Sequence, residues 1–197
     1  SQTYKIDKNI YLESLFWIGE SNFIQKQYPE AYKNYIELLN CDCKIDNSLR
    51  LNTLYSIAYT LFNNKEYDKS INYFLSYINL KKENDSKLLD AKLRLGDSYY
   101  AIKNYSKSID IYNDLFSESN IDKNYLLYQI GLANYGMNKI EKSIKSFIQI
   151  IENDSSNLID DALFRIASIY FETSKFNLSI EYLSKIIDKY GNSEYIP

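Results

Sequence analysis

The feature that most constrains this chain is a pair of small residues, always twelve positions apart, that occurs five times. The first member is Gly or Ala in an apolar stretch, and the second is Ala or Ser in the next apolar stretch. The pairs are Gly19–Ala31, Ala58–Ser70, Gly96–Ser108, Gly131–Ser143 and Ala167–Ser179. The inner spacing is fixed, whereas successive pairs are 35 to 39 residues apart. We infer one rigid motif joined by loops of different length.

Each half of the motif has the periodicity of an amphipathic helix. Leu54, Ile57 and Leu61, for example, follow helical spacing, and the polar stretch 63–66 separates them from the next apolar arm. Two such helices form an antiparallel hairpin whose backbones approach closely at the small residues. Gly costs about 1 kcal/mol of helix propensity relative to Ala, so its recurrence there indicates a steric need. Large residues are expected to fill the space around the crossing: Tyr35, Phe74, Tyr112, Phe147 and Leu183.

Composition excludes several classes of protein. The chain of 197 residues has no histidine, which removes histidine-based catalysis and histidine metal sites. Two cysteines are too few for a disulfide-framed miniprotein or a four-cysteine zinc site. With 45% hydrophobic residues, 5 Gly and 2 Pro, the sequence favours a mostly helical protein with a substantial core.

Charge and the lengths of the apolar runs give no sign of a nucleic-acid partner or of a membrane-spanning segment. The net charge is −3, and the densest basic spot, Lys81 and Lys82, lies beside Glu83 and Asp85 and is interpreted as a solvated loop. A nucleic-acid partner is not expected, because such proteins cluster their cations. No apolar run approaches the ~20 residues of a membrane-spanning segment.

The pattern of Leu, Gly/Ala, Tyr, Ala/Ser and Phe/Tyr positions resembles the tetratricopeptide repeat (TPR) family over roughly residues 11 to 193. The resemblance implies an all-α fold, a right-handed TPR superhelix (α-solenoid) of about five helix-turn-helix repeats. The approximate repeats, in a single array over 1–197, are 12–45, 51–84, 89–122, 124–157 and 160–193. This sequence departs from the family at the late small position of the second helix, which here holds Leu38, Tyr77, Leu115, Ile150 and Ile186.

The resemblance also implies a partner-binding concave face, lined by the first helix of each repeat. By position, that lining consists of Glu13, Phe16, Trp17, Glu20, Phe23, Asn52, Tyr55, Tyr59, Phe62, Asp90, Arg94, Asp97, Tyr100, Tyr125, Tyr128, Gln129, Tyr135, Asp161, Phe164, Arg165 and Phe171. The candidate contacts chosen from it are Phe16, Trp17, Tyr55, Tyr59, Arg94, Asp97, Tyr128, Gln129, Phe164 and Arg165.

One register of this lining is aromatic in all five repeats: Phe23, Phe62, Tyr100, Tyr135 and Phe171. It could form an aromatic groove for a peptide, since rigid rings give contact area at low entropic cost. Helical spacing favours the other interpretation, in which the register is core between repeats. Phe16, Tyr55 and Tyr128, two turns earlier, are the better groove candidates.

Arg94 and Arg165 occupy the same register of their helices, two repeats apart. They could bind a carboxylate or phosphate. Ion pairs with Asp97 and Asp161, three and four residues away, are the favoured interpretation. The remaining positions hold aromatics and acids, so the carboxylate clamp of some TPR domains is not expected.

Cys41-Asp42-Cys43 could hold half a metal site or a local disulfide, but two ordinary thiols are favoured. No catalytic residue, cofactor or metal site is predicted. The many carboxylates are expected in loops and at helix N-termini, where the macrodipole favours them.

The stretch 188–197 reads as a loop and the start of another unit, so the chain is expected to be a segment of a longer array. The style of its last repeat is similar to TPR proteins of bacterial envelopes, such as the lipoprotein of outer-membrane β-barrel assembly. The compartment is left open, with the periplasm favoured over the cytoplasm.

The predicted function is a non-catalytic scaffold that binds a protein or peptide along the concave face. Two alternatives are kept. One is a structural or oligomerisation module of a larger envelope protein, self-associating through the open solenoid ends. The other is a small-ligand or glycan binder with an aromatic groove.

Overall fold

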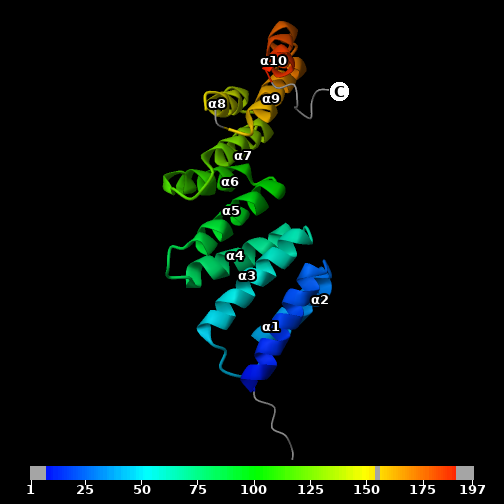
Figure 1. Ribbon diagram of the computed structural model, residues 1–197, viewed down its shortest axis with the longest axis vertical. Helices are drawn as coiled ribbons and strands as arrows, with labels where there is room; N and C mark the ends of the chain where they lie inside the picture. Colours follow the sequence, from blue (N-terminus) through cyan, green and yellow to red (C-terminus); the bar gives the residue numbers. More distant parts are fainter. Residues whose placement is uncertain (1–7, 154–155, 190–197) are drawn as a thin grey trace, which may run out of the picture. The chain divides into compact units, whose positions relative to one another are not determined.

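The computed structural model describes residues 8–153 and 156–189, and over these residues it contains ten α-helices, one short 3-10 helix and no strand (Figure 1). This confirms the predicted all-α fold. The chain divides into two compact units, one ending at Ile102 and the other beginning at Lys103. The units are described separately. The expectation about residues 190–197 lies outside the described residues.

Unit 1 contains two complete helical hairpins and the first helix of a third. In it, α1 pairs with α2 and α3 with α4, while α2 packs on α3 and α4 on α5 (Figure 1). The helices are α1 (Lys8–Ile24), α2 (Tyr28–Leu39), α3 (Asn47–Asn63), α4 (Tyr67–Leu80) and α5 (Ser86–Ala101).

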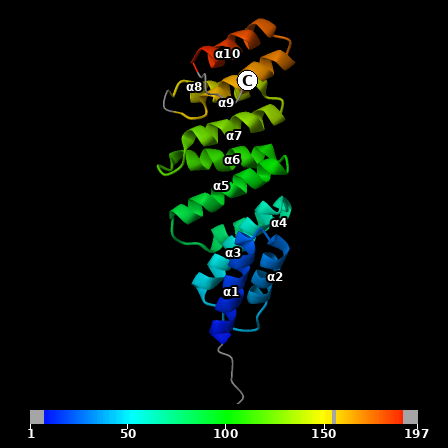
Figure 2. The same cartoon turned by 45° about the vertical axis from the view of Figure 1, so that its right-hand side comes forward.

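Unit 2 continues the same pattern. Here α7 pairs with α8 and α9 with α10, α6 packs on α7, and α8 on α9 (Figure 2). The elements are α6 (Tyr105–Asp114), η1 (Leu115–Ser117), α7 (Lys123–Gly136), α8 (Ile140–Ile151), α9 (Ile159–Glu172) and α10 (Phe176–Lys189). No helix among the described residues has both the length and the apolarity to cross a membrane.

The small residues stand where a large side chain of the second helix lies against the first. A Cβ atom added to Gly19 would lie 2.5 Å from Cε1 of Tyr35, and one added to Gly131 would lie 2.7 Å from Cε1 of Phe147. Both rings are fully buried. The predicted steric need for glycine is therefore confirmed at these two crossings. Among the five large residues predicted to fill such crossings, Leu183 differs, because it is 37% exposed.

At two crossings, the serine of the second helix also donates a hydrogen bond to the first helix. Oγ of Ser70 donates to the carbonyl of Ala58, and Oγ of Ser143 donates to the carbonyl of Gly131, each at 2.8 Å. Both serines are buried, so these bonds satisfy hydroxyls that would be costly to leave unpaired.

Each hairpin turn contains a residue with left-handed backbone geometry, seven positions after the small residue of the first helix. These residues, with φ between 58° and 63°, are Lys26, Lys65, Lys103, Asn138 and Ser174. The turn after α3 shows the consequence: the N–H of Glu66 bonds the carbonyl of Leu61 at 2.8 Å, which closes the helix end. The fixed twelve-residue spacing follows from this repeated turn.

The prediction of two free thiols is wrong. Cys41 and Cys43 form a disulfide in the loop between α2 and α3. Both half-cystines are half-buried against the core cluster of Leu12, Leu15 and Leu38. This packing brings the two side chains together, which the sequence spacing alone did not indicate.

The acidic loops behave as predicted. Asp46 accepts hydrogen bonds from two N–H groups of the first turn of α3, and Asp85 and Asp122 each accept one at the starts of α5 and α7. Lys81 pairs with Glu83 at 3.0 Å and with Asp85 at 2.9 Å, in the loop expected for this charged stretch. These residues order the connections and take no part in the site below.

Candidate partner-binding face

Within each unit, the first helices of neighbouring repeats are joined side by side through polar side chains. We call the surface that these helices form in a unit the first-helix face of that unit: α1, α3 and α5 in unit 1, and α7 and α9 in unit 2. The residues that bond across this face are 31 to 37 positions apart in sequence. Each bond therefore links equivalent or nearly equivalent positions of neighbouring repeats.

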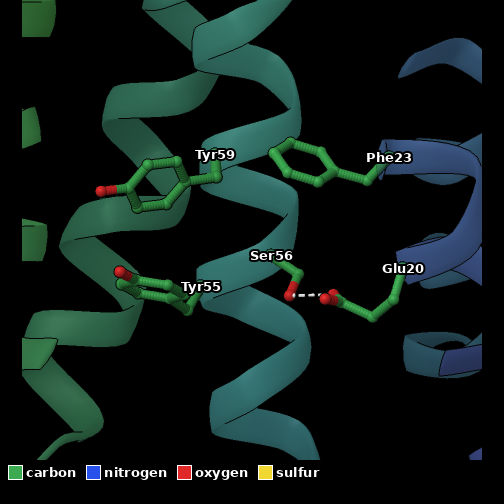
Figure 3. Close-up of a pocket in the computed structure, with 5 residues that line it drawn as sticks. All are labelled: Glu20, Phe23, Tyr55, Ser56 and Tyr59. Carbon is green, nitrogen blue, oxygen red and sulfur yellow. Dashed lines mark hydrogen bonds between the residues drawn. The ribbon is translucent and has the colours of Figure 1, made fainter. Parts of the chain in front are cut away.

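Glu20 lies at the centre of the link between α1 and α3. Its Oε1 atom accepts hydrogen bonds from the hydroxyls of Tyr35 and Ser56, each at 2.6 Å. Figure 3 shows the bond from Ser56. Burial and the Glu20 carboxylate raise the pKa of Tyr35 well above its ordinary value of 10.0. The Tyr35 hydroxyl therefore stays protonated and remains a hydrogen-bond donor. Two hydrogen bonds thus fix the position of the Glu20 carboxylate.

Asp90 forms the corresponding link between α3 and α5. Its Oδ2 atom accepts hydrogen bonds from the hydroxyls of Tyr55, at 2.6 Å, and Tyr59. Burial, together with the bond to Asp90, raises the pKa of Tyr59 to about 12. Arg94 completes the group: Nε donates to the Tyr59 hydroxyl at 3.3 Å, and Nη1 pairs with Asp97 at 2.8 Å. The ion pair predicted between Arg94 and Asp97 is confirmed.

Lys87 adds a second cation beside these tyrosines. Its Nζ atom donates to Oδ1 of Asn52 at 2.9 Å and lies 4.4 Å from the centre of the Tyr55 ring. Burial lowers the pKa of Lys87, although the charge of Glu20 acts in the opposite direction. The Tyr55 ring is thus held on one side by a cation and at its hydroxyl by Asp90.

A pocket of about 320 Å³ opens in unit 1 between α1 and α3. Figure 3 shows Glu20 and Phe23 extending from α1 toward α3, while Tyr55 and Tyr59 leave α3 on its other side. The lining consists of Glu20, Phe23, Tyr55, Ser56 and Tyr59. Three aromatic rings, two of which are phenols, the hydroxyl of Ser56 and one carboxylate therefore define its chemistry.

In unit 2 the first-helix face is bridged differently. Nε of Arg165 in α9 donates to the hydroxyl of Tyr128 in α7 at 3.0 Å. Nearer the hairpin turn, the hydroxyl of Tyr135 donates to Glu172. Gln129 and Phe164 are half-buried on this face, whereas Arg165 is exposed.

Sequence comparisons agree with this geometry. Family models described as tetratricopeptide repeat match residues 51–84, 90–119, 125–157 and 161–193, which together cover more than half of the chain. The chain belongs to the tetratricopeptide repeat family. Its paired helices, small crossing residues and laterally bonded first helices are the TPR architecture in atomic detail.

Solved structures confirm the TPR fold. MamA 41-end from Desulfovibrio magneticus RS-1 is 17% identical, with a TM-score of 0.72 over 93% of this chain and 97% of that one. The apo form of RapI is 16% identical, with a TM-score of 0.72 over 94% of this chain and 73% of that one. A putative kinesin light chain with TPR-like repeats from Podosopora anserina is 10% identical, with a TM-score of 0.69 over 93% and 96%. At these identities the likeness concerns the fold alone.

No curated protein matched the sequence. The finer resemblance of the last repeat to the envelope lipoprotein of β-barrel assembly is not supported by these comparisons.

The residues predicted as TPR partner contacts fall into different environments. Tyr55 and Tyr59 line the pocket, and Arg94 and Asp97 belong to the polar group behind them. Trp17 is 65% exposed on α1, and its ring meets Phe16 edge-on at 5.4 Å between centres. Phe16 packs against the core cluster of Ala31 and Tyr35 and does not line the pocket.

The aromatic register near the hairpin turns has no single role. Phe23 packs on the core cluster shared by the first two repeats, so the inter-repeat core interpretation is correct there. It is wrong for Phe171, which is 63% exposed and contacts Phe176 across its own turn at 5.5 Å. Phe62 likewise meets Tyr67 at 5.5 Å. The register therefore also braces individual hairpins, and only Phe23 reaches the pocket.

Sequence reasoning missed Ser56 entirely and did not select Glu20 as a contact. Their shared signal was present, however. The position of Ser56 holds large residues in the other repeats, namely Trp17, Arg94, Gln129 and Arg165. A small side chain in that register leaves room for a pocket at this point of the face.

Proposed function

We propose that the chain is a non-catalytic scaffold that binds a partner peptide or protein along the first-helix face, with the unit 1 pocket as its central contact. The observation that carries the proposal is the pocket of about 320 Å³ whose polar side chains are held in place by hydrogen bonds. Binding to side chains that are already ordered loses less entropy, which favours affinity.

The surroundings of the pocket support a peptide as the ligand. Its volume is at the lower end of the range for ligand sites, about 300–1,000 Å³, and suits one anchoring side chain. Trp17 provides an exposed ring on the same helix as Glu20. Tryptophan, tyrosine and arginine are the residues that most often carry interface energy. In unit 2, Tyr128, Gln129, Phe164 and Arg165 are proposed as partner contacts on the first-helix face of that unit.

A pocket-filling variant tests this function. Random peptides displayed on phage are selected on the purified protein, and their affinity is measured for wild type, Ser56→Tyr and Asn72→Tyr. Ser56→Tyr fills the pocket and is expected to weaken binding at least tenfold. Asn72→Tyr, which introduces the same tyrosine side chain at an exposed position of α4, should leave the affinity unchanged.

Circular dichroism and thermal unfolding establish that both variants fold. If a folded Ser56→Tyr protein binds the peptides with unchanged affinity, the peptides bind outside this pocket. Failure to enrich any peptide would contradict peptide binding itself.

A second candidate function, self-association, is favoured by α10. Ile180 and Ile187 are 61% and 67% exposed, although the corresponding face of α8 is covered by α9. We propose that the first helix of a second copy covers this face of α10. Sedimentation velocity should then show association that Ile180→Asp abolishes, and a monomer at every concentration would contradict it.

A further inference from the structure

Only one of the two carboxylate oxygens of Glu20 accepts hydrogen bonds from the described part of the protein. Both hydrogen bonds that it accepts, from Tyr35 and Ser56, end on Oε1. Within residues 8–153 and 156–189, Oε2 receives no hydrogen bond, and Glu20 forms no ion pair. Glu20 is half-buried and lines the pocket. One carboxylate oxygen is therefore available to an occupant of the pocket.

The neighbouring acids Asp90 and Asp97 differ from Glu20, because a cation of the chain lies against both of them. Asp90 accepts two tyrosine hydroxyls and has Nε of Arg94 3.7 Å from its other oxygen. Asp97 pairs with Arg94 at 2.8 Å. Both of these acids therefore lie against one cation of the chain itself, Arg94, which they share. Glu20 has the hydroxyl donors but lacks the cation.

The rest of the lining suits a cation with an apolar stem. Phe23, Tyr55 and Tyr59 contribute three aromatic rings, whose faces attract cations and whose surfaces accept methylene groups. Tyr55 already has one cation near its ring, namely Nζ of Lys87 at 4.4 Å. That contact places a cation against one of the three rings.

Lys87 itself does not neutralise Glu20. Its ammonium group is held by Asn52 at 2.9 Å, and no ion pair joins it to Glu20. The two charges act on each other, because Glu20 raises the pKa of Lys87, but this effect is smaller than that of burial. Lys87 therefore lowers the negative potential of the pocket without occupying it.

We propose that the pocket binds a lysine or arginine side chain of the partner peptide, with Oε2 of Glu20 as its counter-ion and its stem against the aromatic side chains of the lining. The inference rests on the proposed function, because it requires a peptide on the first-helix face. It adds the chemical class of the anchoring residue, which neither the fold nor the family determines.

Glu20→Gln is the decisive variant, because it preserves the local structure. The glutamine Oε1 accepts the same two hydroxyl hydrogen bonds, while its NH2 group replaces the free oxygen by a donor that repels a cation. Glu30→Gln is the matched control: it removes the same charge at an exposed position of the neighbouring helix α2, outside the pocket and the first-helix face.

The first measurement uses displayed peptides with blocked N-termini, so that a basic side chain is the only source of an amine or guanidinium. Wild type and Glu30→Gln should enrich peptides with Lys or Arg at one fixed position, and Glu20→Gln should not. Replacing that residue by norleucine in a synthetic, acetylated and amidated peptide should weaken binding to wild type about tenfold. The same replacement should leave binding to Glu20→Gln nearly unchanged.

Two results would overturn the inference. Enriched peptides without a basic preference would leave the proposed function standing and remove the cation from it. An equal loss on norleucine replacement in wild type and Glu20→Gln would show that the basic residue binds elsewhere.

A second probe works even if no peptide is enriched. Acetyl-Gly-Lys-Gly-amide and its norleucine analogue are titrated separately while the NMR signals of Ser56 and Phe23 are followed. The lysine probe should shift these signals in wild type and Glu30→Gln but not in Glu20→Gln. The absence of a shift in wild type, or equal shifts with both probes, would contradict the inference.

Discussion

The two units of this TPR protein place different chemistry on the same positions of the repeat. In unit 1, Glu20 accepts the hydroxyls of Tyr35 and Ser56. The equivalent positions of unit 2 hold Leu132, Phe147 and Arg165. There, Leu132 packs on the core cluster that contains Phe147, and Arg165 donates to the hydroxyl of Tyr128. Among these positions, unit 1 has a carboxylate, that of Glu20, whereas unit 2 has a guanidinium cation, that of Arg165.

The difference shows that these residues change as a group. A half-buried carboxylate is stabilised by hydroxyl donors, and a buried tyrosine hydroxyl needs an acceptor. Where the acid is replaced by leucine, the tyrosine is replaced by phenylalanine. The crossing glycine is kept in both units, since Gly19 and Gly131 meet rings of similar size. Backbone packing is therefore shared, whereas the chemistry of the face is chosen separately in each unit.

The largest expected difference between the units concerns their glycines. Gly19→Ala places Cβ against the Tyr35 ring, which is held by its bond to Glu20, and should cost about 2–3 kcal/mol. Gly131→Ala meets the ring of Phe147, which has no hydroxyl and can shift, so its net cost should be about 1 kcal/mol. Urea unfolding followed by circular dichroism and by Trp17 fluorescence measures both. Equal losses would mean that the Tyr35 hydroxyl does not restrain its ring.

Exchanging the group should exchange the charge preference. A variant with Phe16→Tyr, Glu20→Leu, Tyr35→Phe and Ser56→Arg carries the unit 2 chemistry in unit 1. It should bind a lysine-anchored peptide at least tenfold weaker, a loss of about 1.4 kcal/mol, and should bind the same peptide better when glutamate replaces the lysine. Affinities are measured by calorimetry, with Glu30→Leu as control. Retained lysine preference would show that the group does not set the charge of the site.

Alkaline pH should affect the tyrosine links of unit 1. The pKa of Tyr59 is raised to about 12, above its ordinary value of 10.0, because of burial and Asp90. A raised pKa in the folded state means that this stabilisation is complete below pH 10 and is lost as the pH rises from 10 to 12. Wild type should therefore lose urea stability more steeply over this range than Tyr59→Phe. Identical slopes would contradict the assignment.

The smallest expected difference lies at the hairpin crossings. Ser70→Ala and Ser143→Ala each remove one buried hydrogen bond of 2.8 Å to a helix carbonyl. Each should cost about 1 kcal/mol in urea unfolding, because the bonds are alike in geometry and burial. A clearly larger loss in one unit would show that the crossings are less equivalent than their distances indicate.

The fold was predictable because its constraints are local in sequence. Gly19 and Ala31 are twelve residues apart, and the turn at Lys26 lies between them, so one hairpin carries its own signature. The ion pair of Arg94 and Asp97 was predictable for the same reason, since it spans three residues of one helix. The disulfide of Cys41 and Cys43 was not, because spacing alone does not fix how two neighbouring side chains turn.

The candidate site was only partly predictable. Tyr55 and Tyr59 were selected from their register, but the partner of both, Asp90, is 31 to 35 residues away on another helix. Phe171 was assigned to the core from helical spacing, yet no following repeat covers it among the described residues, and it is 63% exposed. Equivalent positions share a backbone environment, but their exposure depends on what the neighbouring helix supplies.

By itself, the sequence determined that this chain forms TPR hairpins, because small residues, turns and apolar spacing act over a dozen positions. Only the tertiary structure decided which hydroxyls meet which carboxylate and which oxygen of Glu20 is left for a ligand. Those contacts depend on how neighbouring repeats align side by side, over about 35 residues. The physical reason is that hydrogen bonds are directional. The position of a residue in the repeat indicates that its side chain could form such a bond, but only the three-dimensional geometry determines which donor and acceptor meet.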